Sequence, residues 1–593
     1  QHATRALQTW LGAQSFLSDR DRKRLPESRL TVTSAAGGVQ LMRGNFGQSL
    51  TLLFVMSALV LLIAVANLAN LLLARADRAQ AAVRAALGAS AIRLVRQSIT
   101  EGVVLALVGC VGAFLVSMFA TRSIIALAFP PDTIMPVDLV PSSTIVLFSI
   151  GLSLVTGILF AAAPAWAMAR TNPIDALRGL SREGADRSFV PRRSLVVVQV
   201  TLSIVLLAGA GLLTKSLSRL ENQPMGFDAE RRWIVRVDPP TTLAADLDQL
   251  DRVLTTMRQR LEQVPGIEMA TYSLYSPMEG NNWSGPIAIA GRPIDPERRD
   301  ISSWNRVGPN YFETLGTRVL RGRGIVETDT ATSQRVAVVN SAFARQFLEG
   351  RDPLGVQLGR GDASHANDFQ IVGVVEDVKY SGPSRPTVPM IFFPVMQTAP
   401  YTSQSELQTQ TRSMLVRAIE LKVRSGATNL EPGIRRALAD AHPEMAVTRI
   451  LPLDVQVAGN FRNNRLLATL AGSYGVLALL LSALGLYGVT AYGVSRRVHE
   501  IGVRMALGAD RRAIVVGVVR SAVIQTLLGL AIGVPAALAS SSWVATYLYE
   551  VGARDPIVIA TAAGVLIFTA VLAALLPARR AASVNPTQAL RAQ

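Results

Sequence analysis

Residues 504–509 read RMALGA, and residues 84–89, which lie 420 positions earlier, read RAALGA. Two further phrases recur in the same order at nearly the same offset. They are Gly44-Asn45-Phe46 with Gly459-Asn460-Phe461, and Asn172-Pro173 with Asn585-Pro586. Because self-similarity at one long period indicates a repeated structural unit, we infer that the chain is a tandem duplication.

The repeated unit is a membrane unit. Seven apolar stretches reach the ~20 residues with which a helix crosses a bilayer. They lie at 50–74, 99–121, 143–168, 194–215, 465–492, 516–545 and 556–577. Half of the 593 residues are apolar and only 17% are charged, which is atypical of a soluble enzyme. The sequence therefore predicts a polytopic α-helical membrane protein with seven spans in this chain.

Arginine indicates on which side of the membrane each loop lies. Arginines concentrate in the segments 75–98, 170–193 and 495–512 and in the carboxyl-terminal tail, whereas 129–142 contains no Lys or Arg. Because basic loops stay in the cytoplasm, we expect the long polar stretch 217–462 outside. These loops also account for the excess of 59 basic over 42 acidic residues, so the charge predicts no nucleic-acid partner.

The polar stretch 217–462 shows the turn signals and short alternating runs of a folded domain. Strands are expected at 234–237, 335–339, 369–375 and 415–423, and helices at 247–264 and 341–348. Because extended runs alternate with helices, the stretch predicts an α+β domain with one or two small sheets, not a β-sandwich.

The two copies of the unit differ in extent. The second has one span (194–215), the outer domain and three more spans, whereas the first has three spans preceded by residues 1–45. Residues 39–41 resemble residues 455–457 at the end of the outer domain. We therefore expect the intact protein to carry a further span and outer domain ahead of this sequence, with eight spans in all.

Several phrases carry a family resemblance. They are PNYFETLG at 309–316, LRGR at 320–323, VNSAFA at 339–344, DPLG at 352–355, IVGVV at 371–375 and EIGVRMALGA at 500–509. These phrases resemble the MacB/FtsX-type ABC transporter permeases, in particular the duplicated permeases of acidobacteria. The resemblance covers nearly the whole chain and implies a multi-pass protein of the bacterial inner membrane with a MacB-like periplasmic core domain.

The resemblance also implies a division into domains. We expect the tail of a truncated first periplasmic core domain at 1–45, and an amphipathic lead-in and transmembrane helix at 181–216. The complete core domain is expected at 217–462. FtsX-like three-helix permease domains are expected at 46–180 and 463–593.

The resemblance implies that residues 75–98 and 495–515 are coupling elements, each of which touches a copy of a separate ABC ATPase subunit. The residues expected to carry this contact are Gln80, Arg84, Leu87, Gly88, Glu500, Arg504, Leu507 and Gly508. A helix that glycine ends can present an arginine to an acidic groove. Arginines can also simply anchor a loop to lipid headgroups, but anchoring needs no particular residue order. The repeated phrase therefore favours coupling.

One departure separates the two copies of this phrase. The first has Gln80-Ala81 where the second has Glu500-Ile501. The acid that usually stands in the family's segment is thus absent from the first copy, which leaves open whether both halves dock an ATPase equally.

The sequence predicts no ATP site, catalytic residue or metal site of its own. Residues 209–216 read GAGLLTKS, close to a phosphate-binding loop, but Thr214 replaces the second glycine and the phrase closes a span at the outer face. We expect Lys215 to reach the membrane interface instead. A single cysteine, Cys110, and four histidines argue against a disulfide scaffold or a Cys/His metal site. ATP would be bound by the partner subunit, so no cofactor is expected here.

Several residues of the spans and the outer domain have other expected roles. Gly529 and Gly533 lie four apart in the sixth span, and Gly109 and Ala113 occupy the corresponding places in the second. Small residues at this spacing let helices approach closely, so we expect packing between halves or subunits. Asn67 and Asn70 should face protein and not lipid. In the outer domain, His365 and His442 are expected to be solvated, and Arg360-Gly361-Asp362 is assigned no role.

Two function classes follow from these observations. The first is the permease subunit of an ABC transporter, which couples ATP hydrolysis by a separate ATPase to export or to mechanotransmission in the periplasm. The alternative is a non-transporting membrane lever that regulates a periplasmic enzyme or signalling partner. A membrane-anchored ectoenzyme is disfavoured, because 217–462 lacks Gly-x-Ser-x-Gly and His-Glu-x-x-His motifs. The substrate cannot be derived from the sequence.

Overall fold

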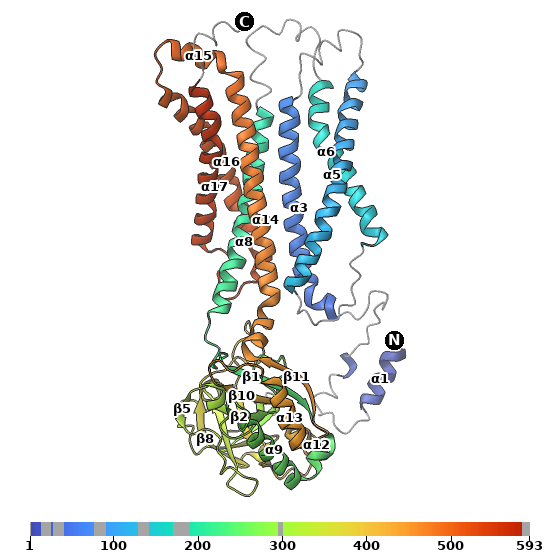
Figure 1. Cartoon of the computed structure of the whole chain (residues 1–593), viewed down its shortest axis with the longest axis vertical. Helices are drawn as coiled ribbons and strands as arrows, with labels where there is room; N and C mark the ends of the chain where they lie inside the picture. The colour runs from blue at the N-terminus through green and yellow to red at the C-terminus, as the bar shows by residue number, and fades with distance from the viewer. Residues whose placement is uncertain are drawn as a thin grey trace. The chain divides into compact units, whose positions relative to one another are not determined.

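The computed structural model describes residues 2–12, 25–27, 41–75, 91–128, 141–169, 190–293 and 300–583 (Figure 1). The chain divides into two compact units. The first, here called the outer unit, comprises Gln1–Gly38 and Asn222–Phe461. The second, called the membrane unit, comprises Val39–Glu221 and Arg462–Gln593.

Long helices make up the described part of the membrane unit. They are α3 (Leu41–Arg75), α5 (Ala91–Ala128), α6 (Ser143–Ala169), α8 (Val190–Glu221), α14 (Leu453–Arg496), α15 (Val498–Ala506), α16 (Arg511–Ala545) and α17 (Pro556–Ala582). All seven stretches that the sequence predicts as spans are therefore helical. Of the described residues, six segments are long and apolar enough to cross a bilayer. The seventh stretch lies in α6, where the described apolar segment, Ser143–Leu159, is shorter.

Helix α8 is the central helix of the membrane unit, because it buries two of its faces. One face, with Val196, Val200 and Ile204, packs into a cluster with α14, α16 and α17. Another, with Leu206 and Leu213, packs into a second cluster with α3 and α14. The neighbours in these clusters are often alanines. They include Ala468, Ala471 and Ala478 on α14 and Ala562, Ala570 and Ala574 on α17. Small side chains let these helices approach closely, as is usual in membranes.

The outer unit is an α+β domain. Its strands are β1 (Arg232–Asp238), β2 (Ile267–Ser273), β3 (Trp283–Ile289), β4 (Ile301–Val307), β5 (Val319–Gly322), β6 (Val336–Asn340), β7 (Gln357–Arg360), β8 (Phe369–Val375), β9 (Met390–Pro394), β10 (Ala418–Val423) and β11 (Ala446–Pro452). Its helices include α9 (Leu247–Glu262), α10 (Tyr311–Leu315), α11 (Ser341–Phe347), α12 (Gln404–Met414) and α13 (Glu431–Ala441), with short 3-10 turns η3 (Thr241–Ala245) and η4 (Ala363–His365). Two further short elements, α1 (His2–Gly12) and η1 (Leu25–Glu27), lie near the amino terminus.

Each secondary-structure element that the sequence predicts in this domain is present. Helix α9 is an example: Asp246 accepts a hydrogen bond from the backbone of Gln249 at its start, as an N-cap does. Its buried positions, including Leu250, Leu254 and Leu261, follow the spacing of one helical face. Strand β8 and helix α11 likewise begin at the predicted residues 369 and 341.

The arrangement of the strands differs from the prediction of one or two small sheets. The eleven strands found in the described residues join in one sheet, ordered β11-β1-β10-β2-β4-β3-β7-β8-β6-β9, with β5 beside β8. A parallel pairing of β4 with β9 closes the last six strands of this order into a ring. The ring joins the four-stranded part only where Ser273 of β2 pairs with Val307 of β4. Each part has its own core, one around Trp304 and Phe392 and the other around Met257 and Ile419.

Arg306 and Glu420 are among the buried ionisable groups of this sheet. Arg306 on β4 is surrounded by acceptors: its guanidinium donates to Ser413 Oγ (2.8 Å) and to the carbonyl oxygens of Pro394 (3.0 Å) and Gln397 (2.7 Å). Burial lowers the pKa of Arg306 to about 9. Glu420 on β10 is 1% exposed, and burial raises its pKa to about 8.

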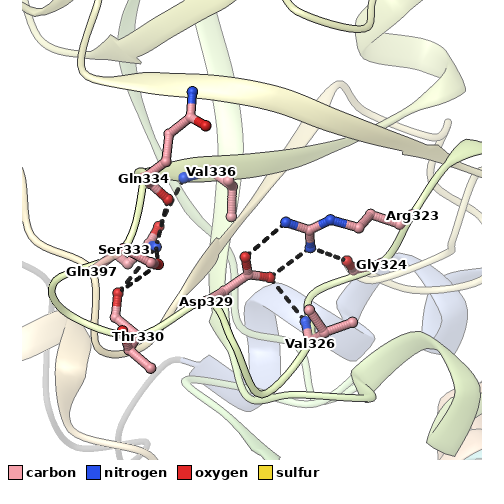
Figure 2. Close-up of polar contacts among 9 residues, drawn as sticks. All are labelled: Arg323, Gly324, Val326, Asp329, Thr330, Ser333, Gln334, Val336 and Gln397. Atoms are coloured by element: carbon pink, nitrogen blue, oxygen red, sulfur yellow. Dashed lines mark hydrogen bonds and ion pairs between the residues drawn. The ribbon is translucent and has the colours of Figure 1, made fainter.

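The turn between β5 and β6 is held by two polar clusters (Figure 2). Arg323 makes a two-pronged ion pair with Asp329, at 2.7 and 2.8 Å, and Asp329 also accepts from the backbone of Val326. Gln397 is fully buried and accepts from the backbone of Val336 at 2.8 Å. Its amide nitrogen donates to Thr330, Ser333 and Gln334 at 3.0–3.2 Å. Arg323, in the phrase LRGR, therefore has a structural role.

One prediction for the outer domain is wrong. His365 is buried, not solvated: its Nδ1 lies 2.7 Å from an Asp368 carboxylate oxygen, and its ring packs on Tyr401. His442 is partly buried at the end of α13. The triplet 360–362 also has a structural role, since the Arg360 guanidinium lies 3.7 Å above the Trp304 ring.

Candidate functional site

The predicted coupling segment of the second copy forms a short helix, α15, which follows α14 after a single residue. Ile501 and Gly502 are its buried positions, whereas Glu500 and Arg504 are exposed. The Arg504 guanidinium lies 2.6 Å from a Glu500 carboxylate oxygen, one helical turn earlier. An exposed pair at this spacing contributes only about 0.3–0.5 kcal/mol. Its main effect is therefore to hold the arginine on one face of α15.

Gly508 ends α15, as the sequence predicts. Its φ of +94° is one that glycine adopts without strain. The Gly508 N–H donates to the Met505 carbonyl (3.1 Å), and the Ala509 N–H donates to the Arg504 carbonyl (2.9 Å). These two bonds are the Schellman pattern of a helix end. Asp510 then caps α16 by accepting from the Arg512 N–H, so the turn from α15 to α16 is well determined.

Leu507 lies at the tip of α15, where it is 83% exposed. It stands between the exposed Arg504 and the glycine turn, outside the apolar part of α16. The tip thus combines a large apolar side chain and a guanidinium on a short, fixed helix. This combination is suited to contact with another protein, because arginine is a frequent anchor at interfaces and an exposed apolar side chain gains free energy when a partner buries it.

The matching residues of the first copy cannot be placed in the same way. Gln80, Arg84, Leu87 and Gly88 all lie outside the described residues. The expected second coupling site therefore stays a prediction from the repeated sequence.

The glycines of the sixth span pack against α8. A Cβ added at Gly529 would lie 2.6 Å from the Cβ of Val200, and one added at Gly533 would lie 3.0 Å from the Cα of Thr201. The Thr201 hydroxyl donates to the Gly529 carbonyl at 3.0 Å. Both helices belong to the second copy, so this contact lies within one half and not between halves, contrary to the expectation.

The corresponding positions of the first copy have no such neighbour. Around the position of a Cβ at Gly109, no atom of the described chain lies within 4 Å, and Ala113 is exposed. Cys110 beside them is partly exposed.

Polar side chains form hydrogen bonds between helices inside the membrane unit, and the bond from Asn67 joins the first copy to the second. Asn67 of α3 and Gln199 of α8 both donate to the Leu481 carbonyl of α14, at 3.2 and 2.9 Å. Ser203 and Ser482 hydrogen-bond at 2.7 Å. Asn67 and Asn70 are each 5% exposed, which confirms that they face protein. Gln199 is not among the residues predicted above, although a lone amide within an apolar stretch is a signal of such a contact.

The outer end of α8 is tied to the loop before α17. The Lys215 ammonium lies 2.5 Å from an Asp555 carboxylate oxygen, and Ser216 Oγ accepts from the Tyr549 N–H at 2.8 Å. Hydrogen bonding to Lys215 lowers the pKa of Asp555. Lys215 is therefore an ion-pair partner of Asp555, a contact that the sequence does not predict. Residues 209–216 are helical throughout, and so do not form a phosphate-binding loop.

These features define a class of protein: a multi-span membrane protein with a duplicated helical unit and a large α+β domain. Two family models agree with this description. The model named FtsX-like permease C-terminal matches residues 54–173 and again 472–586. The model named MacB-like periplasmic core domain matches residues 194–431. The chain belongs to the MacB/FtsX-like ABC transporter permeases, and the double match confirms the duplication.

Individual relatives are distant. The chain is 22% identical over 306 residues to the ABC transporter permease YknZ of Bacillus subtilis, which covers 50% of this chain and 71% of that one. It is 26% identical over 290 residues to the macrolide export ATP-binding/permease protein MacB of Campylobacter jejuni, covering 48% and 43%. The periplasmic region of MacB from Actinobacillus actinomycetemcomitans aligns with 40% of this chain and 95% of that one, at 15% identity and a TM-score of 0.26.

Proposed function

We propose that this permease couples ATP binding and hydrolysis by a separate ABC ATPase to export, or to mechanical work on a partner, on the outer side of the bacterial inner membrane. Two ATPase copies would dock, one on each half. The observation that carries the proposal is the tip of α15, where Arg504 and the 83% exposed Leu507 lie on a helix that Gly508 ends. The same phrase, Arg-x-Ala-Leu-Gly-Ala, recurs at 84–89.

A protein-docking role explains the exposed Leu507, whereas an anchoring of the arginines to lipid would not. Arginines attracted to headgroups need only their charge, whereas Leu507 would gain most from an apolar pocket. Burying a leucine that is otherwise in water contributes about 1.5–3 kcal/mol. The Schellman turn fixes the direction of this side chain, which lowers the entropy lost on docking. The tip of α15 is thus organised for a protein partner.

The proposed path to the outer side is α14. It is one uninterrupted helix of 44 residues, which at 1.5 Å per residue extends about 66 Å. Its first turns are bonded to the loop between β2 and β3. The Gln456 amide donates to Ser276 Oγ (2.9 Å) and to the Pro277 carbonyl (2.7 Å), and Asn460 donates to the Met278 carbonyl (2.8 Å). A displacement of α15 would therefore reach this loop through a stiff helix.

The test is binding of the ATPase subunit to the full chain in lipid nanodiscs. Substituting Leu507→Asp places a charge where the proposal needs an apolar contact, and should weaken ATPase binding about tenfold or more. The matched control is Leu407→Asp, which changes a 42% exposed leucine on α12 of the outer unit. Binding is measured by affinity pull-down and quantified by mass spectrometry.

The control should bind like the unchanged chain. Equal ATPase recovery with Leu507→Asp would show that the tip of α15 does not dock the ATPase. Failure to recover any ABC ATPase from native membranes, under conditions that preserve other membrane complexes, would overturn the proposal as a whole.

A further inference from the structure

Glu420 on β10 lies in the contact between the two parts of the outer unit, the ring and the four-stranded part. Ile419 and Leu421, its neighbours in the strand, face the core of the four-stranded part. Because successive side chains of a strand point to opposite faces, Glu420 points the other way, toward the ring. Ile234, directly opposite on β1, belongs to the core of the ring. A carboxyl group is therefore buried where the two parts meet.

The strands of the two parts pair at one place. Ser273 of β2 pairs with Val307 of β4, and beside this pair the Leu274 N–H donates to the Arg306 carbonyl at 2.9 Å. Because the ladder between the parts is so short, side chains must supply much of the attraction between them.

A chain of polar side chains crosses the contact. Ser273 Oγ donates to one Glu420 carboxylate oxygen at 2.5 Å and is within hydrogen-bonding reach of the Tyr311 hydroxyl. The Tyr311 and Tyr380 hydroxyls lie 2.6 Å apart, and Asn305 of β4 reaches Tyr380 in turn. All five side chains are at most 3% exposed. The chain begins in the four-stranded part and ends in the ring, so it bridges the two.

The surroundings of Glu420 suit a protonated carboxyl better than an ionised one. Its second oxygen has no hydrogen-bond partner in the described chain, whereas both oxygens of a buried carboxylate need donors. Burial, together with the negative charge of Glu279 in the loop after β2, raises the pKa of Glu420 to about 8. The cations on the same face of β1 and β10 are engaged with other acids: Arg232 with Asp228, Arg236 with Glu279 and Lys422 with Glu268.

Glu279 belongs to the loop that holds the first turns of α14. It accepts from the Ser276 N–H at 2.9 Å and pairs with Arg236 at 3.4 Å. Ser276 Oγ accepts from the Gln456 amide of α14 at 2.9 Å. A negative charge on Glu420 would therefore repel a residue of the loop through which α14 is attached.

We propose that Glu420 is a protonation switch between the ring and the four-stranded part. With its proton, the carboxyl completes an uncharged network and the two parts stay in contact. When the proton passes to water at mildly alkaline pH, the carboxylate needs donors that the closed contact lacks, so the contact loosens until water reaches it. A looser contact would also weaken the grip of the outer unit on α14. This last consequence rests on the proposed function, whereas the switch itself does not.

The test measures the separation of the two parts in the full chain in nanodiscs, by pulsed electron spin resonance between pH 6 and 9. The spin labels are attached at Ala331→Cys, exposed in the turn between β5 and β6, and at Ala439→Cys, exposed on α13. The single native cysteine is removed by Cys110→Ser. The distribution of distances should widen with rising pH, with a midpoint near pH 8.

One variant and one control isolate the carboxyl. Glu420→Gln cannot ionise, so its distribution should stay narrow over the whole range. Glu431→Gln, which changes an exposed partner of Arg435, should widen like the unchanged chain.

Two further variants should move the midpoint in opposite directions, which a general loss of packing would not do. Ser273→Ala removes the one donor to the carboxylate, and should raise the midpoint by about one pH unit. Glu279→Gln removes the neighbouring negative charge, and should lower it by about as much. These two variants carry the test should Glu420→Gln fail to fold.

The proposal is overturned by a distribution that stays the same from pH 6 to 9 in the unchanged chain, or by a widening that persists in Glu420→Gln. Equal midpoints for Ser273→Ala and Glu279→Gln would also overturn it. These measurements contain no ATPase, so their failure leaves the proposed function standing. Equal ATPase recovery with Leu507→Asp would likewise leave the switch standing.

Discussion

Helices α5 and α16 are the same element in the two copies, yet their small-residue faces have different surroundings. On α16, Gly529 and Gly533 lie so close to α8 that added Cβ atoms would overlap it. On α5, Gly109 meets no described atom within 4 Å, and Ala113 is exposed. The spacing of small residues thus permits close approach but does not supply the partner. What decides the contact is a facing helix whose side chains fit, here Val200, Thr201 and Ile204 of α8.

The largest effect is expected from filling the packed face. Gly533→Leu would drive a side chain into Ile204 and the Thr201 backbone. Overpacking usually costs about 1–3 kcal/mol, but here backbone atoms must also separate, so we expect little folded protein after detergent extraction. The measurement is the monodisperse fraction in size-exclusion chromatography, together with the melting temperature.

The control for this substitution is Gly564→Leu, on a face of α17 with open space. It should extract and melt like the unchanged chain. A normal melting temperature for Gly533→Leu would show that α16 and α8 are not packed as described here.

The duplication and the long apolar helices could be derived from the sequence because each rests on a strong local constraint. A phrase repeated at one offset marks a repeated unit, and an apolar run must be about 20 residues long to cross a bilayer. The ring of six strands could not be derived. It is closed by pairing β4 with β9, whose partners Ser303 and Met390 lie far apart in the chain, and no local pattern encodes such a pairing.

The candidate site likewise has features that the sequence predicts and features that it does not. The end of α15 at Gly508 follows from glycine's freedom at positive φ, so it could be predicted. The packing of α14, α15 and α16 against one another could not, because the sequence does not fix the rotation of these helices about their axes. The burial of His365 likewise could not be predicted, because it depends on packing against Tyr401 in the tertiary fold.

In the outer unit, two buried charged side chains differ in the number of their hydrogen-bond partners. Arg306 is surrounded by acceptors, whereas Glu420 has only Ser273, which donates to one carboxylate oxygen at 2.5 Å and leaves the other without a described partner. Glu279 lies near enough to disfavour the charge further, and Tyr311 and Tyr380 are close by. Burial therefore raises the Glu420 pKa to about 8.

The raised pKa of Glu420 predicts how the stability of the outer unit depends on pH. Below about pH 4.5 the carboxyl is protonated in both the folded and the unfolded state, and its contribution to stability is complete. Between about pH 4.5 and 8 only the folded state holds the proton, so the free energy of unfolding should fall by about 1.4 kcal/mol per pH unit. Glu420→Gln mimics the protonated group and should remove this slope. Hydrogen exchange of the β10 amides, measured from pH 5 to 8, reports the difference between the two proteins.

Other titrating groups cancel in that difference, because they are common to both chains. Parallel pH profiles for Glu420→Gln and the unchanged chain would mean that Glu420 is ionised in the folded outer unit. The matched variant Glu431→Gln, in an exposed pair with Arg435, should leave the slope unchanged.

A smaller effect should separate the two copies of the Arg-x-Ala-Leu-Gly-Ala phrase, if each docks an ATPase as proposed. Glu500 holds Arg504 at 2.6 Å, whereas Gln80 stands at the corresponding place before Arg84. A pair at this spacing contributes about 0.3–0.5 kcal/mol. Glu500→Gln should therefore weaken ATPase binding about twofold, and Gln80→Glu should strengthen it about twofold. Titration calorimetry on nanodiscs measures both. A change in the same direction in both variants would show that the acid does not act by ordering the arginine.

The smallest effect is expected at the open face. Gly109→Leu places its side chain where no described atom lies within 4 Å. The free energy of unfolding should therefore change by no more than about 0.5 kcal/mol, as is usual for surface substitutions, and the melting temperature should be nearly unchanged. The contrast with Gly533→Leu is then a direct measure of what α8 adds to the same small-residue pattern. If Gly109→Leu instead destabilised the protein or changed its oligomeric state, the face of α5 would have a partner helix of its own, as α16 has in α8. Both halves would then use small residues for close packing of helices. They would differ only in whether the partner helix lies within the described chain.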